Sequence, residues 1–166
     1  MVTNHRYFLI VACSQRKRSD PDLLPAIERY DGGNFRLLRK AKREGYFPQS
    51  LDVLILSAKY GLISASTSIA NYDQRMTSER AKELQEQTVQ TLQSYARQHS
   101  YQEVYVDLGQ DYYPAIGDIS KIFNDASIIY AQGKIGERLA RVKHWLIEKS
   151  NAEQVIFNDT SKVGEV

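Results

Sequence analysis

Four short apolar runs recur along the chain, and longer segments with helical spacing separate them. The runs are rich in β-branched and aromatic residues, and the first two are almost continuously apolar, as in strands that are buried on both faces. We therefore predict four strands of one sheet, which cover residues 7–12, 52–56, 103–107 and 126–130.

Apolar residues that recur three or four positions apart predict helices between these strands. The longest helix is expected from residue 77 or 78 to residue 98, with Ser78 able to cap it and with Leu84, Val89 and Leu92 as its buried stripe. The other helices are expected over residues 34–43, 111–123 and 136–149.

Strands that alternate with helices predict an α/β fold of three layers, in which a mostly parallel sheet of about four to five strands carries helices on both faces. Residues 1–150 are expected to form this single domain, and the polar residues 151–166 a partly loose tail. Right-handed crossovers place most strand C-termini at one edge of such a sheet, where ligands usually bind. The loops of interest therefore follow the strands, at residues 13–18, 57–73, 108–113 and 131–136.

Length and composition narrow the class of protein. The 166 residues fit one domain with a proper core, and the longest apolar run is far too short to span a membrane. No cleavage site follows the apolar run near the N-terminus, and a single cysteine excludes an internal disulfide, which agrees with a reducing compartment. We expect a cytoplasmic monomer that makes no membrane contact.

The net charge is only +2, but the charges are unevenly distributed. Up to residue 60 there are eleven Lys or Arg residues against six Asp or Glu residues. This excess indicates either a phosphate-bearing partner or a solvated helix face, and charge alone does not separate the two.

The loop after the first strand combines a small hydroxyl residue with three cations. Ser14 is followed by Arg16, Lys17 and Arg18, and this group suits a phosphate held by backbone N–H groups and side chains. Cys13, at the strand end, is more commonly a small buried residue than a nucleophile.

The loop after the second strand is the most informative. Gly61 permits a sharp exit from the strand, and the loop carries Lys59, Tyr60, Tyr72 and Asp73. The tyrosines suit the stacking of a base or sugar, and Asp73 suits the orientation of water. In the alternative interpretation, Lys59 pairs with Asp73 and both tyrosines pack against the body of the protein.

The third and fourth loops carry weaker signals. Gly109 allows close approach of a ligand, and Asp111 is expected to cap the following helix, from where its carboxylate can still face a cleft. Gly133, Lys134 and Gly136 open a helix whose N-terminal amides suit an anion. The three histidines are scattered, so we predict no metal site and no cofactor.

Taken together, these segments resemble a family of small bacterial and phage domains, in order over roughly residues 8–146. The specific part is the sequence LSAKYGLI at residues 56–63, and Ser64 to Ser68 departs from the acidic or proline residue that the family often has next. The other matching positions are Cys13, Ser14, Arg16, Lys17, Pro25, Ala26, Tyr30, Phe35, Tyr72, Asp73, Met76, Gly109, Asp111, Tyr112, Gly133, Lys134, Gly136 and Leu139.

The segment at residues 56–63 is also similar to that of the YaaA peroxide-stress proteins, which bind DNA, although no helix-hairpin-helix pattern is evident here. A related domain is attached to archaeosine synthase, a tRNA-modifying enzyme. The broader superfamily resembles uracil-DNA glycosylases, and its small defence members include DNA glycosylases that remove bulky modified bases from phage DNA. The resemblance therefore implies base chemistry on double-stranded DNA of a phage genome.

On this resemblance, the leading hypothesis is a glycosylase that hydrolyses the N-glycosidic bond of a modified base, for example a glucosylated one, in anti-phage defence. Asp73 or Asp111 is expected to stabilise an oxocarbenium-like sugar and to align water, while Lys59 donates to the leaving base or to a phosphate. Attack by the Lys59 amine to form a Schiff base is a less favoured alternative. The extruded base is expected to contact Ser14, Tyr60, Tyr72 and Tyr112.

DNA phosphates are expected to contact exposed cations of the basic loops and of the first helix, which are Arg16, Lys17, Arg18, Arg39, Lys40 and Lys134. Two rival hypotheses remain open. One is a DNA-binding stress protein without catalytic activity, and the other is an enzyme that processes free nucleosides or nucleotides.

Overall fold

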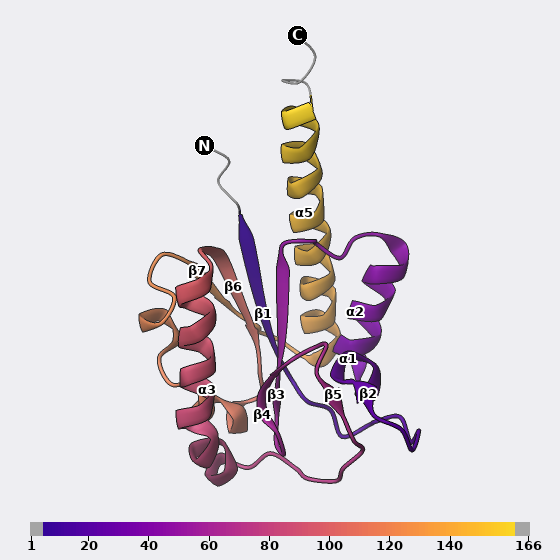
Figure 1. The fold of residues 1–166 in the computed structure, drawn as a ribbon, viewed down its shortest axis with the longest axis vertical. Helices are drawn as coiled ribbons and strands as arrows, with labels where there is room; N and C mark the ends of the chain where they lie inside the picture. The colour runs from indigo at the N-terminus through magenta and orange to yellow at the C-terminus, as the bar shows by residue number, and fades with distance from the viewer. Residues whose placement is uncertain (1–4, 162–166) are drawn as a thin grey trace.

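The computed structural model describes residues 5–161, which form an α/β fold around a five-stranded sheet (Figure 1). The strand order is β4-β3-β1-β6-β7, and every neighbouring pair is parallel except β3 and β4. This confirms the predicted fold class. The strands are β1 (Arg6–Ala12), β3 (Leu51–Ser57), β4 (Gly61–Ser64), β6 (Tyr101–Asp107) and β7 (Ser127–Tyr130).

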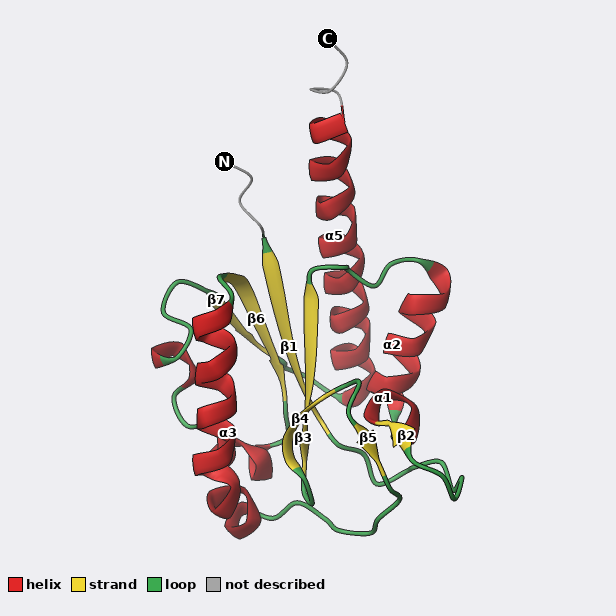
Figure 2. Cartoon of the chain, in the orientation of Figure 1, coloured by secondary structure: helices red, strands yellow, loops and turns green. Residues whose placement is uncertain are grey.

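Helices lie on both faces of this sheet, as Figure 2 shows. One face carries α2 (Gly33–Glu44) and α5 (Ile135–Ser161), and the other carries α3 (Ser78–Gln98) and the short α4 (Tyr113–Ile116). The remaining elements are β2 (Leu24–Pro25), α1 (Ala26–Arg29), β5 (Ser68–Ile69), η1 (Gln110–Tyr112) and η2 (Ile119–Lys121).

Strand β1 is the centre of the sheet and is apolar on both faces. Tyr7, Leu9 and Val11 join the core beneath α2 and α5, whereas Phe8 and Ile10 join the core beneath α3. This alternation explains the continuous apolar run in the sequence, because each successive side chain of a strand meets the opposite layer of helices.

The strand register fixes where the connecting loops emerge. Ala12 of β1 lies opposite Leu56 of β3, and Val11 lies opposite Asp107 of β6. Since these three strands are parallel, their C-terminal ends meet at one edge of the sheet, as the sequence predicted.

Two predicted segments are divided differently in the structure. The helix predicted over residues 111–123 is wrong as a single element, because η1, α4 and η2 replace it and Gly117 has φ 58° and ψ −142°, which no helix can continue. The loop predicted over residues 57–73 contains the antiparallel edge strand β4 and the short strand β5.

The N-cap of α3 is Thr77 and not Ser78. The Thr77 side chain accepts a hydrogen bond from the Arg80 N–H.

Helix α5 continues far beyond residue 149, so the expectation of a loose tail is wrong for residues 151–161. Figure 1 shows its last turns rising past the body of the protein. The Glu153 carboxylate accepts the Gln49 N–H at 2.9 Å and the Ser50 N–H at 2.8 Å, and these bonds tie the polar segment to the start of β3. The rest of the predicted tail, residues 162–166, lies outside the described residues.

Within residues 5–161, no helix combines the length and the hydropathy that crossing a lipid bilayer would require.

A fully buried arginine organises the segment that follows β1. The Arg29 Nη1 donates to the carbonyls of Arg18 (2.7 Å) and Asp20 (2.9 Å), and its Nη2 donates to those of Asp22 and Ile69. One guanidinium thus binds three carbonyls of the irregular segment that follows β1 and one carbonyl of β5, and it joins the two.

Replacement of Arg29 by Met is expected to lower the free energy of unfolding by about 3 kcal/mol, because several buried carbonyls lose a charged donor. Urea denaturation measures the change. The matched control is Arg43→Met on the exposed side of α2, which we expect to shift the free energy by less than about 0.5 kcal/mol. Similar losses in both variants would contradict the assigned role.

Candidate functional site

A cavity of about 460 Å³ opens at the edge of the sheet where β1, β3 and β6 end. We call it the carboxylate cleft, because two aspartates from separate loops line it. It brings together parts of the first, second and third loops that the sequence singled out. Its lining residues are Cys13, Ser14, Gln15, Lys17, Asp73, Gln74, Arg75, Met76, Thr77, Asp111 and Tyr112.

Asp73 and Asp111 are both exposed on this lining. Asp73 lies on the loop between β5 and α3, and Asp111 lies within η1, where its Oδ1 accepts from the Ser78 hydroxyl at 3.4 Å. The expected role of Asp111 as a helix cap is wrong, because Gly109 occupies the N-cap position of η1. The carboxylate is therefore part of the cleft surface.

Tyr112 and Cys13 form one wall of the carboxylate cleft. The Tyr112 hydroxyl lies 3.4 Å from the Cys13 Sγ and 3.4 Å from the Cys13 carbonyl oxygen. Burial, together with the neighbouring Cys13, raises the pKa of Tyr112 well above its usual range, so the phenol is neutral at physiological pH. Cys13 is half-buried: it packs against the core of the sheet but also lines the cleft, so it is less enclosed than the buried residue that the sequence favoured.

The hydroxyl of Ser14 is used within its own loop. Its Oγ donates to the Arg16 carbonyl at 2.7 Å and accepts the Gly32 N–H at 3.2 Å. Ser14 thus lines the cleft and also shapes the basic loop beside it.

Two cations lie on the same lining. The Lys17 ammonium donates to the Gln15 carbonyl at 3.3 Å and lies 4.4 Å from the centroid of the Tyr72 ring. Burial lowers the pKa of Lys17, although the nearby Cys13 and Asp73 act in the opposite direction. Arg75, which the sequence analysis did not single out, donates to the Gln15 Oε1 at 3.4 Å from the opposite loop.

A closed set of three hydroxyls lies behind the cleft. The Tyr30 hydroxyl is 3.1 Å from the Ser57 Oγ and 2.6 Å from the Tyr72 hydroxyl, which is 2.9 Å from the same Ser57 Oγ. Ser57 also accepts the N–H groups of Lys59 (3.3 Å) and Tyr60 (3.1 Å). Burial raises the pKa of Tyr30 to about 12 and raises that of Tyr72 further, so all three groups stay neutral.

Tyr60 and Tyr72 therefore pack together and lie outside the lining of the carboxylate cleft. Their rings meet edge to face with centroids 5.4 Å apart, and the Lys59 ammonium lies 5.3 Å from the Tyr60 centroid. No ion pair joins Lys59 to Asp73 among the described residues. Of the predicted base-binding residues, the structure thus places Ser14 and Tyr112 on the cleft.

The predicted phosphate-binding cations differ in their surroundings. Arg39 is largely buried and donates to the carbonyls of Ile27 and Tyr30 and to the Asp31 carboxylate, so its guanidinium is held by contacts within the protein. Arg18 pairs with Asp20 and Glu28, and Lys40 pairs with Glu44 at 3.9 Å. Among these predicted cations, Arg16 and Lys134 are exposed and have no ion pair within residues 5–161.

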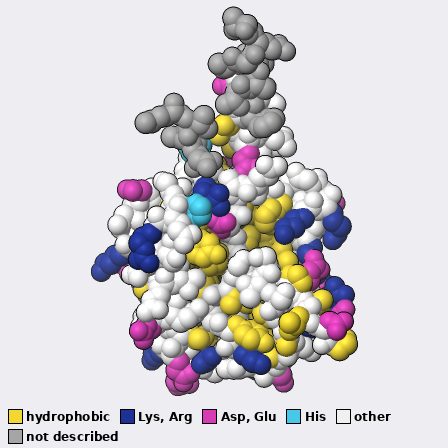
Figure 3. Space-filling model, in the orientation of Figure 1, with side chains coloured by type: hydrophobic (Ala, Val, Ile, Leu, Met, Phe, Trp, Pro, Cys, Tyr) yellow, Lys and Arg dark blue, Asp and Glu magenta, His cyan; other side chains and the backbone are white. Residues whose placement is uncertain are grey.

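The edge of the sheet at which the strands end does not carry charge of one sign. Figure 3 shows Lys and Arg side chains interspersed with Asp and Glu side chains along the lower rim of the molecule. The positive excess of the first sixty residues is thus partly balanced by acidic neighbours, as for Asp31, whose pKa is held at about 2 by hydrogen bonds from Arg36 and Arg39.

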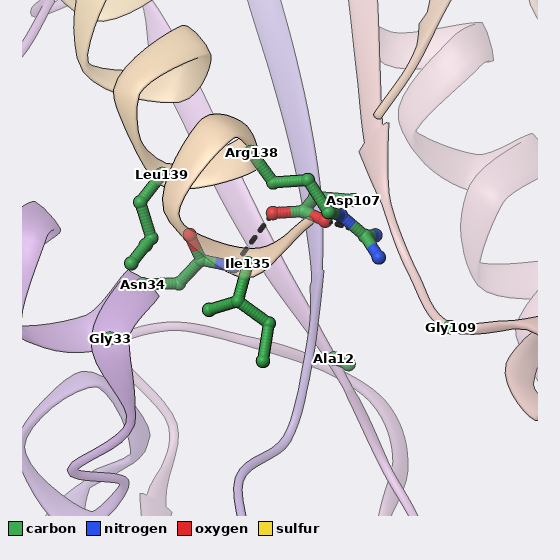
Figure 4. Close-up of a pocket in the computed structure, with 8 residues that line it drawn as sticks. All are labelled: Ala12, Gly33, Asn34, Asp107, Gly109, Ile135, Arg138 and Leu139. Atoms are coloured by element: carbon green, nitrogen blue, oxygen red, sulfur yellow. Dashed lines mark hydrogen bonds and ion pairs between the residues drawn. The ribbon is translucent and has the colours of Figure 1, made fainter. Parts of the chain in front are cut away.

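A second, smaller cavity of about 210 Å³ lies beside the carboxylate cleft, between α2 and α5 (Figure 4). We call it the Asp107 pocket. The buried Asp107 carboxylate accepts from the Asn34 amide at 2.8 Å and from the Arg138 guanidinium, which also donates to the Leu108 carbonyl at 3.1 Å. Its lining residues are Ala12, Gly33, Asn34, Asp107, Gly109, Ile135, Arg138 and Leu139.

The sequence analysis missed Ser57 and Asp107 as parts of the site. Both are polar residues at the C-terminal end of an otherwise apolar strand, and this position is the signal that distinguishes them. Among the described residues, no group of three or more His, Cys, Asp or Glu side chains is arranged to hold a metal ion.

Comparison with known proteins gives a family and one solved structure. Residues 8–144 match the model described as "Family of unknown function (DUF6884)". The fold is similar to the "Crystal structure of AF0587, a protein of unknown function", with a TM-score of 0.48 and 14% identity over 86% of this chain and 44% of that chain. The chain thus spans less than half of the length of that protein. No curated protein matches the sequence.

Replacement of Ser57 by Ala is expected to lower the free energy of unfolding by about 2 kcal/mol, because two buried tyrosine hydroxyls and two backbone N–H groups lose their shared partner. Chemical denaturation measures this loss. The exposed Ser127 in β7 provides the control, since Ser127→Ala is expected to change stability by less than about 0.5 kcal/mol. If Ser57→Ala changed the free energy of unfolding as little as Ser127→Ala, the three hydroxyls would not be what stabilises the chain at the end of β3.

Proposed function

The chain belongs to the DUF6884 family, whose function is unknown, and from the geometry of its carboxylate cleft we propose that it is an N-glycosylase acting on a modified base in DNA. The observation that carries the proposal is the presence of Asp73 and Asp111 on one cavity, together with the aromatic wall of Tyr112. Two carboxylates that flank one sugar are the groups that glycoside hydrolysis requires.

The proposed chemistry is hydrolysis at C1′ of a deoxyribose that lies in the carboxylate cleft. As the bond to the base breaks, the base takes the electron pair, positive charge develops on the sugar, and one carboxylate stabilises this charge. The other carboxylate aligns a water molecule and takes its proton as the water attacks C1′, and this proton then neutralises the departed base. The Tyr112 ring provides a flat apolar surface beside them, which suits the face of a base or a sugar.

Double-stranded DNA is the proposed substrate, and the reacting nucleotide has to leave the base stack to reach the cleft. Arg16, Lys17 and Arg75 lie on or beside the mouth of the cleft, where they suit the phosphates that flank an extruded nucleotide. The resemblance to small defence glycosylases supports a modified base of phage DNA, such as a glucosylated base, as the target.

One observation favours a second candidate. A cavity of about 460 Å³ lies within the size range of small-molecule sites, so an enzyme that acts on free nucleosides or nucleotides would use the same carboxylates. Incubation with intact phage DNA and with free nucleotides separates the candidates. Turnover of the free nucleotides alone would support the small-molecule enzyme, and tight DNA binding without base release would support a non-catalytic DNA-binding protein.

Replacement of Asp73 or Asp111 by Asn is expected to slow base release by about 100-fold or more, because Asn neither takes a proton nor stabilises a cationic sugar. Release is measured on hypermodified phage DNA by alkaline cleavage of the abasic sites, with unmodified DNA alongside. The control is Asp125→Asn, an exposed aspartate outside the cleft. Full activity in both cleft variants would refute the mechanism even if the enzyme is a glycosylase.

Replacement of Arg16 by Ala is expected to weaken DNA binding on all sequences and to reduce the slope of log K against log salt by about 1, because one phosphate contact is lost. Fluorescence anisotropy over a range of salt concentrations measures both effects. Arg97→Ala is the matched control, since Arg97 is exposed at the end of α3 that lies at the opposite edge of the sheet. An unchanged slope for Arg16→Ala would remove this residue from the DNA interface.

A further inference from the structure

Lys17 is the one lysine among the described residues that line the carboxylate cleft. It shares this surface with Asp73 and Asp111, and its ammonium lies closer to the Tyr72 centroid (4.4 Å) than that of Lys59 does (5.8 Å). Lys59 is exposed and lies outside the lining. The structure therefore places a different amine beside the carboxylates from the one that the sequence had suggested.

The backbone on either side of Lys17 is fixed. The Asp31 N–H donates to the Arg16 carbonyl at 2.9 Å, and the Arg18 N–H donates to the Arg29 carbonyl at 2.8 Å. Between these bonds, Lys17 forms a β-bridge with Tyr30. The lysine side chain consequently starts from a rigid position, and a flexible loop does not have to be ordered before its amine can reach the cleft.

The partly buried position of the Lys17 amine suits nucleophilic chemistry in addition to a phosphate contact. The side chain is half-buried, and burial lowers its pKa, which increases the fraction of neutral amine at physiological pH. A partly desolvated lysine is the group with which proteins form Schiff bases with carbonyl groups, and a nearby carboxylate can transfer the protons that this chemistry moves.

We propose that Lys17 attacks the aldehyde of an abasic deoxyribose in the carboxylate cleft, so that the protein also cleaves the DNA strand at abasic sites. The inference rests on the proposed function, because release of a base is what would leave this aldehyde beside Lys17. The substrate class is DNA that carries the ring-opened form of an abasic sugar.

The atoms of the reaction balance without an oxidant or a reductant. The neutral Lys17 amine adds to C1′, and the carbinolamine takes up a proton and loses water to give an iminium ion. Asp73 or Asp111 removes a proton from C2′, and the electron pair passes to the iminium nitrogen. The resulting enamine expels the 3′-phosphate as the C3′–O bond breaks, and water then hydrolyses the imine and restores Lys17.

The test uses the full-length protein and a duplex oligonucleotide with one preformed abasic deoxyribose, so it does not depend on glycosylase activity. Sodium borohydride reduces the imine to a stable amine, and a denaturing gel then shows protein covalently attached to DNA. We expect this product with the wild-type protein and with Lys59→Arg, and we expect its loss with Lys17→Arg, which keeps the charge. A duplex with a tetrahydrofuran abasic analogue, which has no aldehyde, is expected to give no product.

Peptide mass mapping of the wild-type product identifies the attached amine even if a Lys17 variant fails to fold. Attachment at Lys17 supports the proposal, whereas attachment at another amine, or no product at all, overturns it. The two proposals fail separately. Trapping on abasic DNA without base release from modified DNA would refute the glycosylase and leave the role of Lys17 supported. Base release without trapping would support the glycosylase and refute the role of Lys17.

Discussion

The carboxylate cleft depends on the set of hydroxyls formed by Ser57, Tyr30 and Tyr72. Each of these residues belongs to a different segment: the end of β3, the end of α1, and the loop that leads to Asp73. The three hydroxyls satisfy one another in a buried position, where an unpaired polar group would be costly. As a result, contacts made behind the cleft help to position Asp73 relative to the end of β1, in addition to the bond between Arg75 and Gln15 within the cleft.

Much of the fold could be predicted because local patterns of apolar residues indicate its strands and helices. The apolar run of β1 reports burial on both faces, and the parallel arrangement then places Asp73 and Asp111 near one sheet edge without any knowledge of their contacts. The same reasoning could not decide whether the amine of Lys17 or that of Lys59 lies on the cleft, since both residues follow the end of a strand. Which of the two amines faces the cleft depends on the β-bridge between Lys17 and Tyr30, a pairing that no periodic pattern in the sequence reports.

Other features were missed because distant residues decide them. Arg39 has the sequence context of a surface cation, yet the carbonyls of Ile27 and Tyr30 bind its guanidinium. Residues 151–161 are polar, but Glu153 finds backbone donors about a hundred positions earlier in the chain, and α5 continues over them. In both cases the side chain is satisfied by backbone groups at the ends of other elements, and composition does not report such partners.

The sheet ends on both sides in a strand of only four residues, β4 on one edge and β7 on the other. A sheet edge offers unpaired N–H and C=O groups to any extended chain that comes near, and short edge strands keep that row brief. The longer strands, whose apolar side chains would associate most readily with another chain, all lie between these two edge strands. The protein therefore exposes few backbone groups on which a second sheet could grow, and this architecture protects the native state against edge-to-edge aggregation.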